Sequence, residues 1–148
     1  MLTIEHLSIE FASLPVLDDI SFMVNKKDRI ALVGKNGAGK STLLRLIAGE
    51  YTPTAGRIAR DTDLTIGYLP QVMMHTDGKT LREDVSSVFA DAPLEEQARR
   101  IAEMDRTIIG LGFERKDFDR PCSEFSGGWR MRIELAKILL RHPDLLLL

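Results

Sequence analysis

One eight-residue stretch, G-K-N-G-A-G-K-S at residues 34–41, constrains the fold of this chain more than any other feature. It fits the phosphate-binding loop pattern G-x-x-x-x-G-K-[ST] without a mismatch. The apolar run at 30–33 reads as a buried strand before the loop, and residues 40–48 read as a helix after it. Glycines let such a loop turn tightly and bring backbone N–H groups to a phosphate, and a helix start adds unpaired N–H groups. The sequence therefore predicts a nucleotide-phosphate site in an α/β fold.

Two side chains of this stretch supply the chemistry that backbone groups cannot. Lys40 places a point charge on the terminal phosphates, and the Ser41 hydroxyl can ligate Mg²⁺. The alternative is a glycine-rich turn with a surface lysine, but a chance match in one chain has odds of roughly one in a hundred or less. We therefore expect a nucleotide and Mg²⁺ as ligands, held by Gly34, Asn36, Gly37, Ala38, Gly39, Lys40, Ser41 and Thr42.

A second motif lies at residues 125–132, F-S-G-G-W-R-M-R, and precedes a helical stretch at 133–140. Ser126 is a suitable N-cap, and two following glycines leave N–H groups bare at the helix start. Alone, S-G-G would indicate only a cap and a turn. Together, the two motifs resemble the ATP-binding cassette (ABC) family, whose signature loop is usually L-S-G-G-Q. With I-G-Y-L-P-Q at 66–71, the chain most closely resembles the ABC-F subfamily, and the resemblance covers residues 2–148.

The resemblance implies roles for residues outside the phosphate loop. Gln71 would reach Mg²⁺ and the attacking water, and would be the catalytic partner of Lys40. Phe11 would stack on the adenine ring, although an ordinary core phenylalanine is the alternative. Ser126, Gly127 and Gly128 would cap the γ-phosphate held by a second ABC domain, which is therefore an expected partner in the same chain or as a homodimer. Trp129 belongs either to that interface or to the core.

The resemblance also implies a P-loop NTPase fold with a β-rich N-terminal layer and a small helical subdomain. We expect one partial nucleotide-binding domain over 1–148, with the β-rich layer and P-loop core over 1–70. The helical subdomain would span 71–125, and the signature helix and the start of the Walker B strand would span 126–148. Expected strands lie at 2–11, 17–24, 30–33, 57–59 and 64–69, and expected helices at 40–48, 80–89 and from Pro93 to about Gly110. The third helix has its apolar residues at Leu94, Ala98, Ile101, Ile108 and Leu111.

The run P-D-L-L-L-L at 143–148 resembles the strand that leads to an Asp-Glu pair in the family, and the chain ends on its last Leu. We therefore expect a fragment with an incomplete core sheet, which binds ATP but does not turn it over, whereas the complete parent protein hydrolyses ATP. The stretch between Gln71 and Ser126 suits a small helical subdomain but is shorter than the helical arm usual in ABC-F proteins.

The composition of the chain argues against several other classes of protein. The chain has 148 residues, is 44% apolar and carries a net charge of −2, which is ordinary for a globular domain and argues against a generally basic nucleic-acid surface. No apolar run approaches a membrane span and no signal peptide is evident, so we expect no membrane insertion and a cytoplasmic location. The single cysteine, Cys122, excludes an internal disulfide, and the three histidines, His6, His75 and His142, show no metal-ligand spacing.

Three functions remain after these exclusions. The first is a soluble ABC-F-type ATPase acting on the ribosome, which the Trp129 variant of the signature and the Y-L-P-Q string favour. The second is the nucleotide-binding subunit of an ABC membrane transporter, which would share every loop. The third is a binding-only fragment without turnover.

Overall fold

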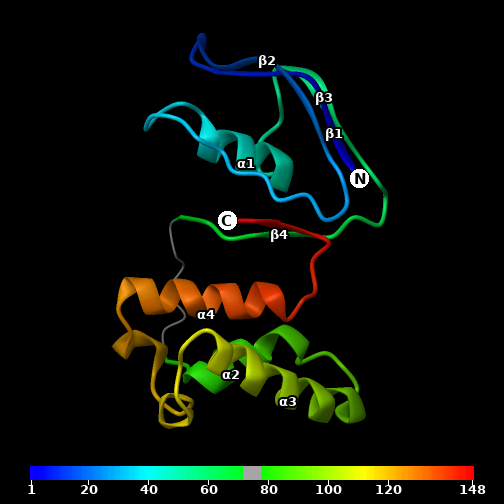
Figure 1. The fold of residues 1–148 in the computed structure, drawn as a ribbon. Helices are drawn as coiled ribbons and strands as arrows, with labels where there is room; N and C mark the ends of the chain where they lie inside the picture. Colours follow the sequence, from blue (N-terminus) through cyan, green and yellow to red (C-terminus); the bar gives the residue numbers. More distant parts are fainter. Residues whose placement is uncertain (72–77) are drawn as a thin grey trace. The chain divides into compact units, whose positions relative to one another are not determined.

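The computed structural model describes residues 1–71 and 78–148 (Figure 1). His75 and most of the loop predicted at 72–79 lie outside the described residues. The chain forms two compact units, which are described separately below. The first comprises residues 1–68 and 144–147, and the second comprises 69–143 and 148. Of the described helices, none is long and apolar enough to cross a membrane.

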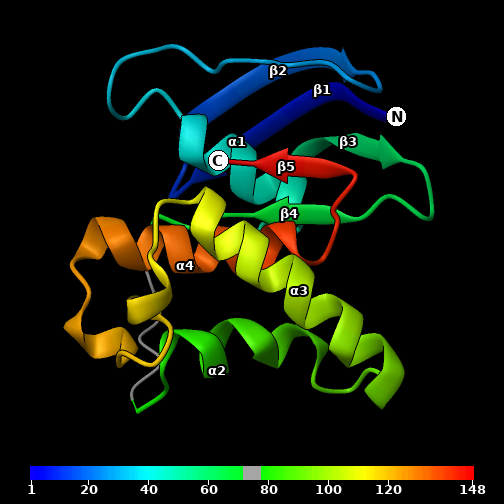
Figure 2. The ribbon, with the colours of Figure 1, turned by 60° about the horizontal axis from the view of Figure 1, so that its bottom comes forward.

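The first unit is built on a three-stranded antiparallel sheet in the order β2-β1-β3 (Figure 2). Its strands are β1 (Leu2–Phe11), β2 (Leu14–Val24) and β3 (Ala55–Arg60). Helix α1 (Lys40–Ala48) buries Leu43, Leu46 and Ile47 in the same core as the apolar side chains of β1. Two short parallel strands, β4 (Ile66–Tyr68) and β5 (Leu145–Leu147), pair with each other. The predictions of a strand at 2–11 and a helix at 40–48 are confirmed.

The buried side chains of β1 are Leu2, Ile4, Leu7 and Ile9, and the step from Ile4 to Leu7 is one residue longer than strand alternation allows. The strand accommodates the extra residue as a bulge at His6, whose φ is 48°. The His6 N–H, which loses its place in the ladder, donates to the Ser21 hydroxyl at 2.8 Å. Gly56 faces this bulge from β3, and its own φ is 78°.

Two predictions for the first unit are wrong. Residues 30–33 form no strand, and Val33 is 93% exposed. A strand exists only where a neighbour pairs with it, and within the described residues no strand pairs with this run. The strand predicted at 17–24 begins three residues earlier, at Leu14, because the turn before it lies at Ala12-Ser13, where φ is 49° and 63°. Such hairpin turns usually carry Asn or Gly, and this pair gave no such signal.

The second unit is helical. Its elements are α2 (Leu81–Ser86), η1 (Ser87–Phe89), α3 (Leu94–Gly110), η2 (Arg115–Asp117), η3 (Cys122–Glu124) and α4 (Gly127–Leu139). The helix predicted at 80–89 starts at a capping box: Glu83 N–H donates to the Thr80 hydroxyl, and Thr80 N–H donates to the Glu83 carboxylate. That backbone donor holds the pKa of Glu83 below its usual value. A buried ion pair joins α2 to α4, because Lys137 Nζ lies 3.1 Å from Asp84 Oδ2.

Of the apolar residues predicted for the third helix, α3 buries Ile108 but leaves Leu94 and Ile101 exposed. Met104 and Ile108 are fully buried, whereas Leu94 is 83% exposed. The apolar spacing at 94, 98 and 101 is real, but every buried side chain of α3 comes from its C-terminal half. Spacing identifies an apolar face and does not say how far along the helix another element covers that face.

The bulge gives a test of the first unit. Gly56→Ala would place a methyl group closer to the His6 carbonyl oxygen than van der Waals contact allows, at a backbone φ that L-residues avoid. We expect it to lower the free energy of unfolding by about 2–5 kcal/mol, as measured by urea titration. Gly49→Ala is the matched control, because Gly49 has φ 83° and no atom within 4 Å of the added methyl. Its loss should be about 1–2 kcal/mol, and equal losses in the two variants would contradict this account of the bulge.

Candidate nucleotide-binding site

The predicted phosphate loop, residues 34–39, runs directly into α1. Gly37 and Gly39 both take the left-handed backbone conformation, with φ of 84° and 86°. Gly39 is buried, and a Cβ there would lie 2.7 Å from Leu17 Cδ2 and 3.2 Å from Val16 Cγ1. The loop therefore rests against β2 at a place where only glycine combines the required φ with the required closeness.

The side chain of Lys40 turns back over this loop. Its ammonium donates to the carbonyl oxygens of Gly34 and Lys35, both at 2.8 Å. Ala38 N–H donates to the Lys35 carbonyl at 3.1 Å. The loop conformation is therefore held by this backbone bond and by the two bonds of the Lys40 ammonium. A cation held only by neutral carbonyls forms stronger, charge-assisted hydrogen bonds with a phosphate. Lys40 thus lies over the loop, and its contact with a phosphate stays a prediction.

The start of α1 offers further donors. Gly39, its N-cap, provides no side-chain cap, and no acidic residue lies in the first turn. The first helical bond runs from Leu43 N–H to the Gly39 carbonyl, so the N–H groups of residues 40–42 have no partner in the helix. Asn36, Gly37 and Ala38 are exposed beside them, and Ser41 and Thr42 are half-buried.

These donors fit a triphosphate better than a bare metal ion. Among residues 1–71 and 78–148, no group of three His, Cys, Asp or Glu side chains could hold a metal. A magnesium ion at this loop would therefore take the Ser41 hydroxyl together with phosphate oxygens, which is how Mg²⁺ is commonly bound with nucleotides. The chemistry of the loop therefore suits ATP and Mg²⁺ when they bind together as a complex.

The other residues assigned through the resemblance lie apart in the sequence. Phe11 ends β1, is 44% exposed, and meets the Tyr51 ring edge-on with centroids 5.5 Å apart. It is thus not the buried core residue that was the alternative. Gln71 is exposed, follows Pro70, and belongs to the second unit together with Ser126.

The signature residues occupy the start of α4. Ser126 is the N-cap residue, as predicted, but its hydroxyl makes no capping hydrogen bond. A Cβ added at Gly127 or Gly128 would meet no atom within 4 Å, so the helix start is open. Arg130 holds the preceding loop instead, by donating to the carbonyls of Phe125 and Ser123, each at 2.8 Å. The N-terminal donors of α4 therefore stay accessible.

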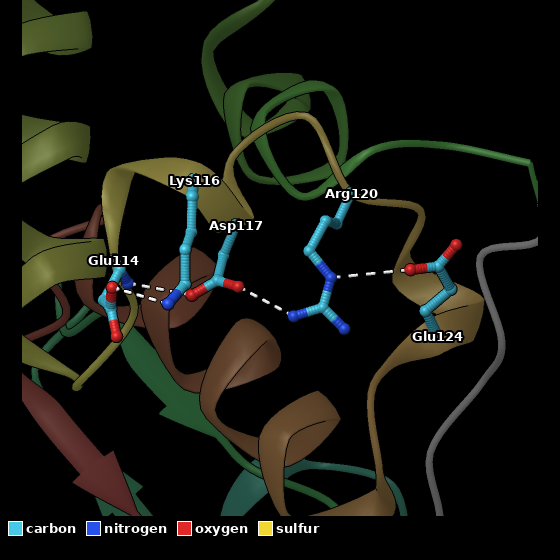
Figure 3. A network of polar contacts seen from close by, with 5 residues as sticks. All are labelled: Glu114, Lys116, Asp117, Arg120 and Glu124. Carbon is cyan, nitrogen blue, oxygen red and sulfur yellow. Dashed lines mark hydrogen bonds and ion pairs between the residues drawn. The ribbon is translucent and has the colours of Figure 1, made fainter.

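A network of ion pairs supports the same loop (Figure 3). Arg120 lies between two carboxylates, 2.7 Å from Asp117 and 3.4 Å from Glu124, and its guanidinium stacks 4.5 Å from the Phe125 ring. The Glu114 N–H and then Arg120 hold the pKa of Asp117 below its usual value. The network borders a cavity of about 370 Å³ next to Ser126 and Trp129. Sequence reasoning missed this network, although the i,i+4 spacing of Arg120 and Glu124 was a readable signal.

Trp129 has a defined place at the surface of the second unit. Its ring lies 4.9 Å from Phe113, the Arg132 guanidinium stacks on it at 4.4 Å, and the residue is 36% exposed. Arg132 also donates to the Leu111 carbonyl at 2.9 Å, which ties α4 to the end of α3. Cys122 is buried, and burial raises the pKa of its thiol to about 11, so it is not a reactive thiolate.

Comparison with known proteins places these features in one family. A family model described as "ABC transporter" matches residues 17–148. The chain is 32% identical to ABC transporter F family member 2 of Arabidopsis thaliana, over 98% of the chain and 27% of that relative. It is 37% identical to the zinc import ATP-binding protein ZnuC of Yersinia enterocolitica, over 100% of the chain and 56% of that relative. The chain thus spans between about a quarter and just over half of these two curated relatives.

Solved structures agree on the fold. An ATP-binding subunit of an ABC transporter superposes with a TM-score of 0.76 at 27% identity, over 99% of this chain and 64% of that one. A dimeric bacterial ABC transporter cassette superposes with a TM-score of 0.80 at 19% identity, over 99% and 72%. The phosphate loop, the open signature helix and these matches together establish that the chain belongs to the ABC transporter family and carries its ATP-binding, P-loop ATPase domain.

Proposed function

We propose that this chain is the nucleotide-binding part of an ABC-F-type ATPase, which binds Mg-ATP at residues 34–42 and, in the whole protein, hydrolyses it to act on the ribosome. The observation that carries the nucleotide part is the Lys40 ammonium, which is held by two carbonyls beside an uncapped helix start. ATP exchanges those neutral acceptors for charged ones. The backbone N–H groups of the loop then surround the phosphates.

Each predicted site residue has a part in this proposal. Lys40 and the loop N–H groups offset the phosphate charge, and the Ser41 hydroxyl orients Mg²⁺, which neutralises phosphate charge when bound. Gln71 has a neutral amide that both donates and accepts, as the positioning of an attacking water requires. Ser126 and the two glycines after it offer an uncapped hydroxyl and open N–H groups to a γ-phosphate held by a second cassette.

The ABC-F assignment is supported by the F-S-G-G-W-R-M-R string and by relatives named as F family members 2 and 5. One observation favours the alternative, a nucleotide-binding subunit of a membrane transporter. The alignment with F family member 2 spans 184 positions although the chain has 148 residues, whereas the alignment with the zinc import protein spans 148. The F family relative therefore carries inserted residues that this chain does not have.

Replacement of Lys40 tests the phosphate loop. Lys40→Ala removes a charge-assisted contact worth roughly 1.5–3 kcal/mol, so Mg-ATP affinity measured by calorimetry should fall about 10- to 150-fold. Lys26→Ala is the matched control, because Lys26 is an exposed lysine in the turn before the loop and should leave affinity unchanged. Equal affinity in wild type and Lys40→Ala, with both folded, would remove the phosphate-loop assignment.

The role of Phe11 has its own test. Stacking uses the face of a ring and not its edge, so Phe11→Ala should weaken ATP and GTP together, by roughly 3- to 10-fold each. Phe11 is 44% exposed and its ring contacts Tyr51, so the free energy of unfolding should fall by no more than about 1.5 kcal/mol, the upper value for one aromatic pair. A variant that loses stability while keeping its nucleotide affinity would show instead that Phe11 serves packing.

The ribosome assignment is tested by sedimentation. The whole protein should pellet with purified ribosomes through a sucrose cushion in the presence of ATP, and Lys40→Ala should reduce the pelleted fraction several-fold. The Lys26→Ala protein serves again as control. No binding by the folded wild-type protein would favour the transporter alternative, and binding that ignores both ATP and Lys40 would contradict the coupling of ribosome contact to the nucleotide site.

A further inference from the structure

Tyr51 contacts both Phe11, the proposed base-stacking residue, and α1, the helix that follows the phosphate loop. It follows α1 by three residues, is half-buried, and contributes the ring that meets Phe11 edge-on, at 5.5 Å between centroids and 69° between planes. Edge-to-face geometry is the favourable arrangement for two aromatic rings. No sequence motif marks this residue.

The hydroxyl end of Tyr51 is fixed to the phosphate-loop helix. Arg45 Nη1 donates to the Tyr51 hydroxyl at 2.8 Å, and the guanidinium lies 5.6 Å from the centre of the Tyr51 ring. Arg45 belongs to the last turn of α1, whose first residue is Lys40. The Arg45 side chain is steadied in turn by Glu50 at 3.8 Å. Tyr51 is thus held at its hydroxyl by α1 and touches Phe11 with its ring.

The strand register places Phe11 near the phosphate loop. Phe11 pairs with Leu14 across the hairpin, and Val16, which lies against Gly39, is two residues further along β2. At about 3.3 Å per strand residue, Leu14, the partner of Phe11, is roughly 7 Å along β2 from Val16, the neighbour of Gly39. Thr54 fixes the segment after Tyr51 to the same end of β1, because its N–H donates to the Ser8 carbonyl and its hydroxyl accepts from Glu10 N–H.

We propose that Tyr51 is a positioning residue for the nucleobase, which holds the exposed Phe11 ring in place for stacking while Arg45 anchors Tyr51 to the helix of the phosphate loop. The proposal rests on the proposed ATP binding at residues 34–42. According to this proposal, the affinity for ATP has two parts. The phosphate part depends on the loop, and the base part depends on Phe11 and, through it, on Tyr51.

Two probes separate these parts. Mg-ATP uses both, and inorganic tripolyphosphate with Mg²⁺ uses the loop alone. Because Tyr51 acts through Phe11, Tyr51→Leu should weaken ATP by no more than the roughly 3- to 10-fold expected for Phe11→Ala, and it should leave tripolyphosphate binding unchanged. Tyr51→Phe keeps the ring and loses only the bond to Arg45, so its ATP affinity should lie between those of the wild type and Tyr51→Leu.

A double-mutant comparison tests whether Tyr51 acts through Phe11. Phe11→Ala with Tyr51→Leu should bind ATP no more weakly than Phe11→Ala alone, since a positioning residue has nothing left to position. Tripolyphosphate binding by each variant reports that the loop is folded, so a misfolded variant is recognised directly. Equal weakening of both probes by Tyr51→Leu, or additive losses in the double variant, would overturn the proposal while leaving the loop assignment intact. Wild-type protein that binds neither probe would overturn the proposed function and this inference together.

Discussion

The close approach of Gly39 to β2 is the contact on which the rest of the first unit depends. Because no Cβ fits between Gly39 and Leu17, the sheet and the phosphate loop meet without a spacer. Helix α1 starts at the next residue, so its free N–H groups and the Lys40 ammonium are placed relative to the strands and not only to the loop. Apolar packing of α1 beneath β1 then keeps that placement.

In the second unit, arginines hold the signature helix where a capping hydroxyl usually would. Arg120 stacks on the Phe125 ring, Arg130 donates to two carbonyls of the preceding loop, and Arg132 stacks on Trp129. A guanidinium can stack on a ring and donate in its plane at once, which an ammonium cannot do. The arrangement leaves the Ser126 hydroxyl out of the cap and thus available to a ligand.

Local signals in the sequence predicted local structure well. The helix predicted at 40–48 has those bounds, with a glycine at each cap, and the helix predicted at 80–89 starts at the Thr80 capping box. The failures concern partners that lie far away in the chain. An apolar run at 30–33 indicates a strand only if another strand pairs with it, and the exposed Leu94 indicates a core position only if a second helix covers it. Neither condition can be read from the run itself.

The same division applies inside the candidate site. The proposed phosphate recognition would use residues 34–42, which are consecutive, so the prediction of this set rests on one motif at 34–41 and the residue after it. The base contact would instead combine residues from three places in the chain: Phe11 from β1, Arg45 from the end of α1, and Tyr51 from the segment after it. These residues have no fixed spacing, because the strand register and not the chain order brings them together. A site of this kind therefore shows its phosphate-binding part in a motif, whereas the residues that support the base contact, such as Tyr51, are found only in the folded structure.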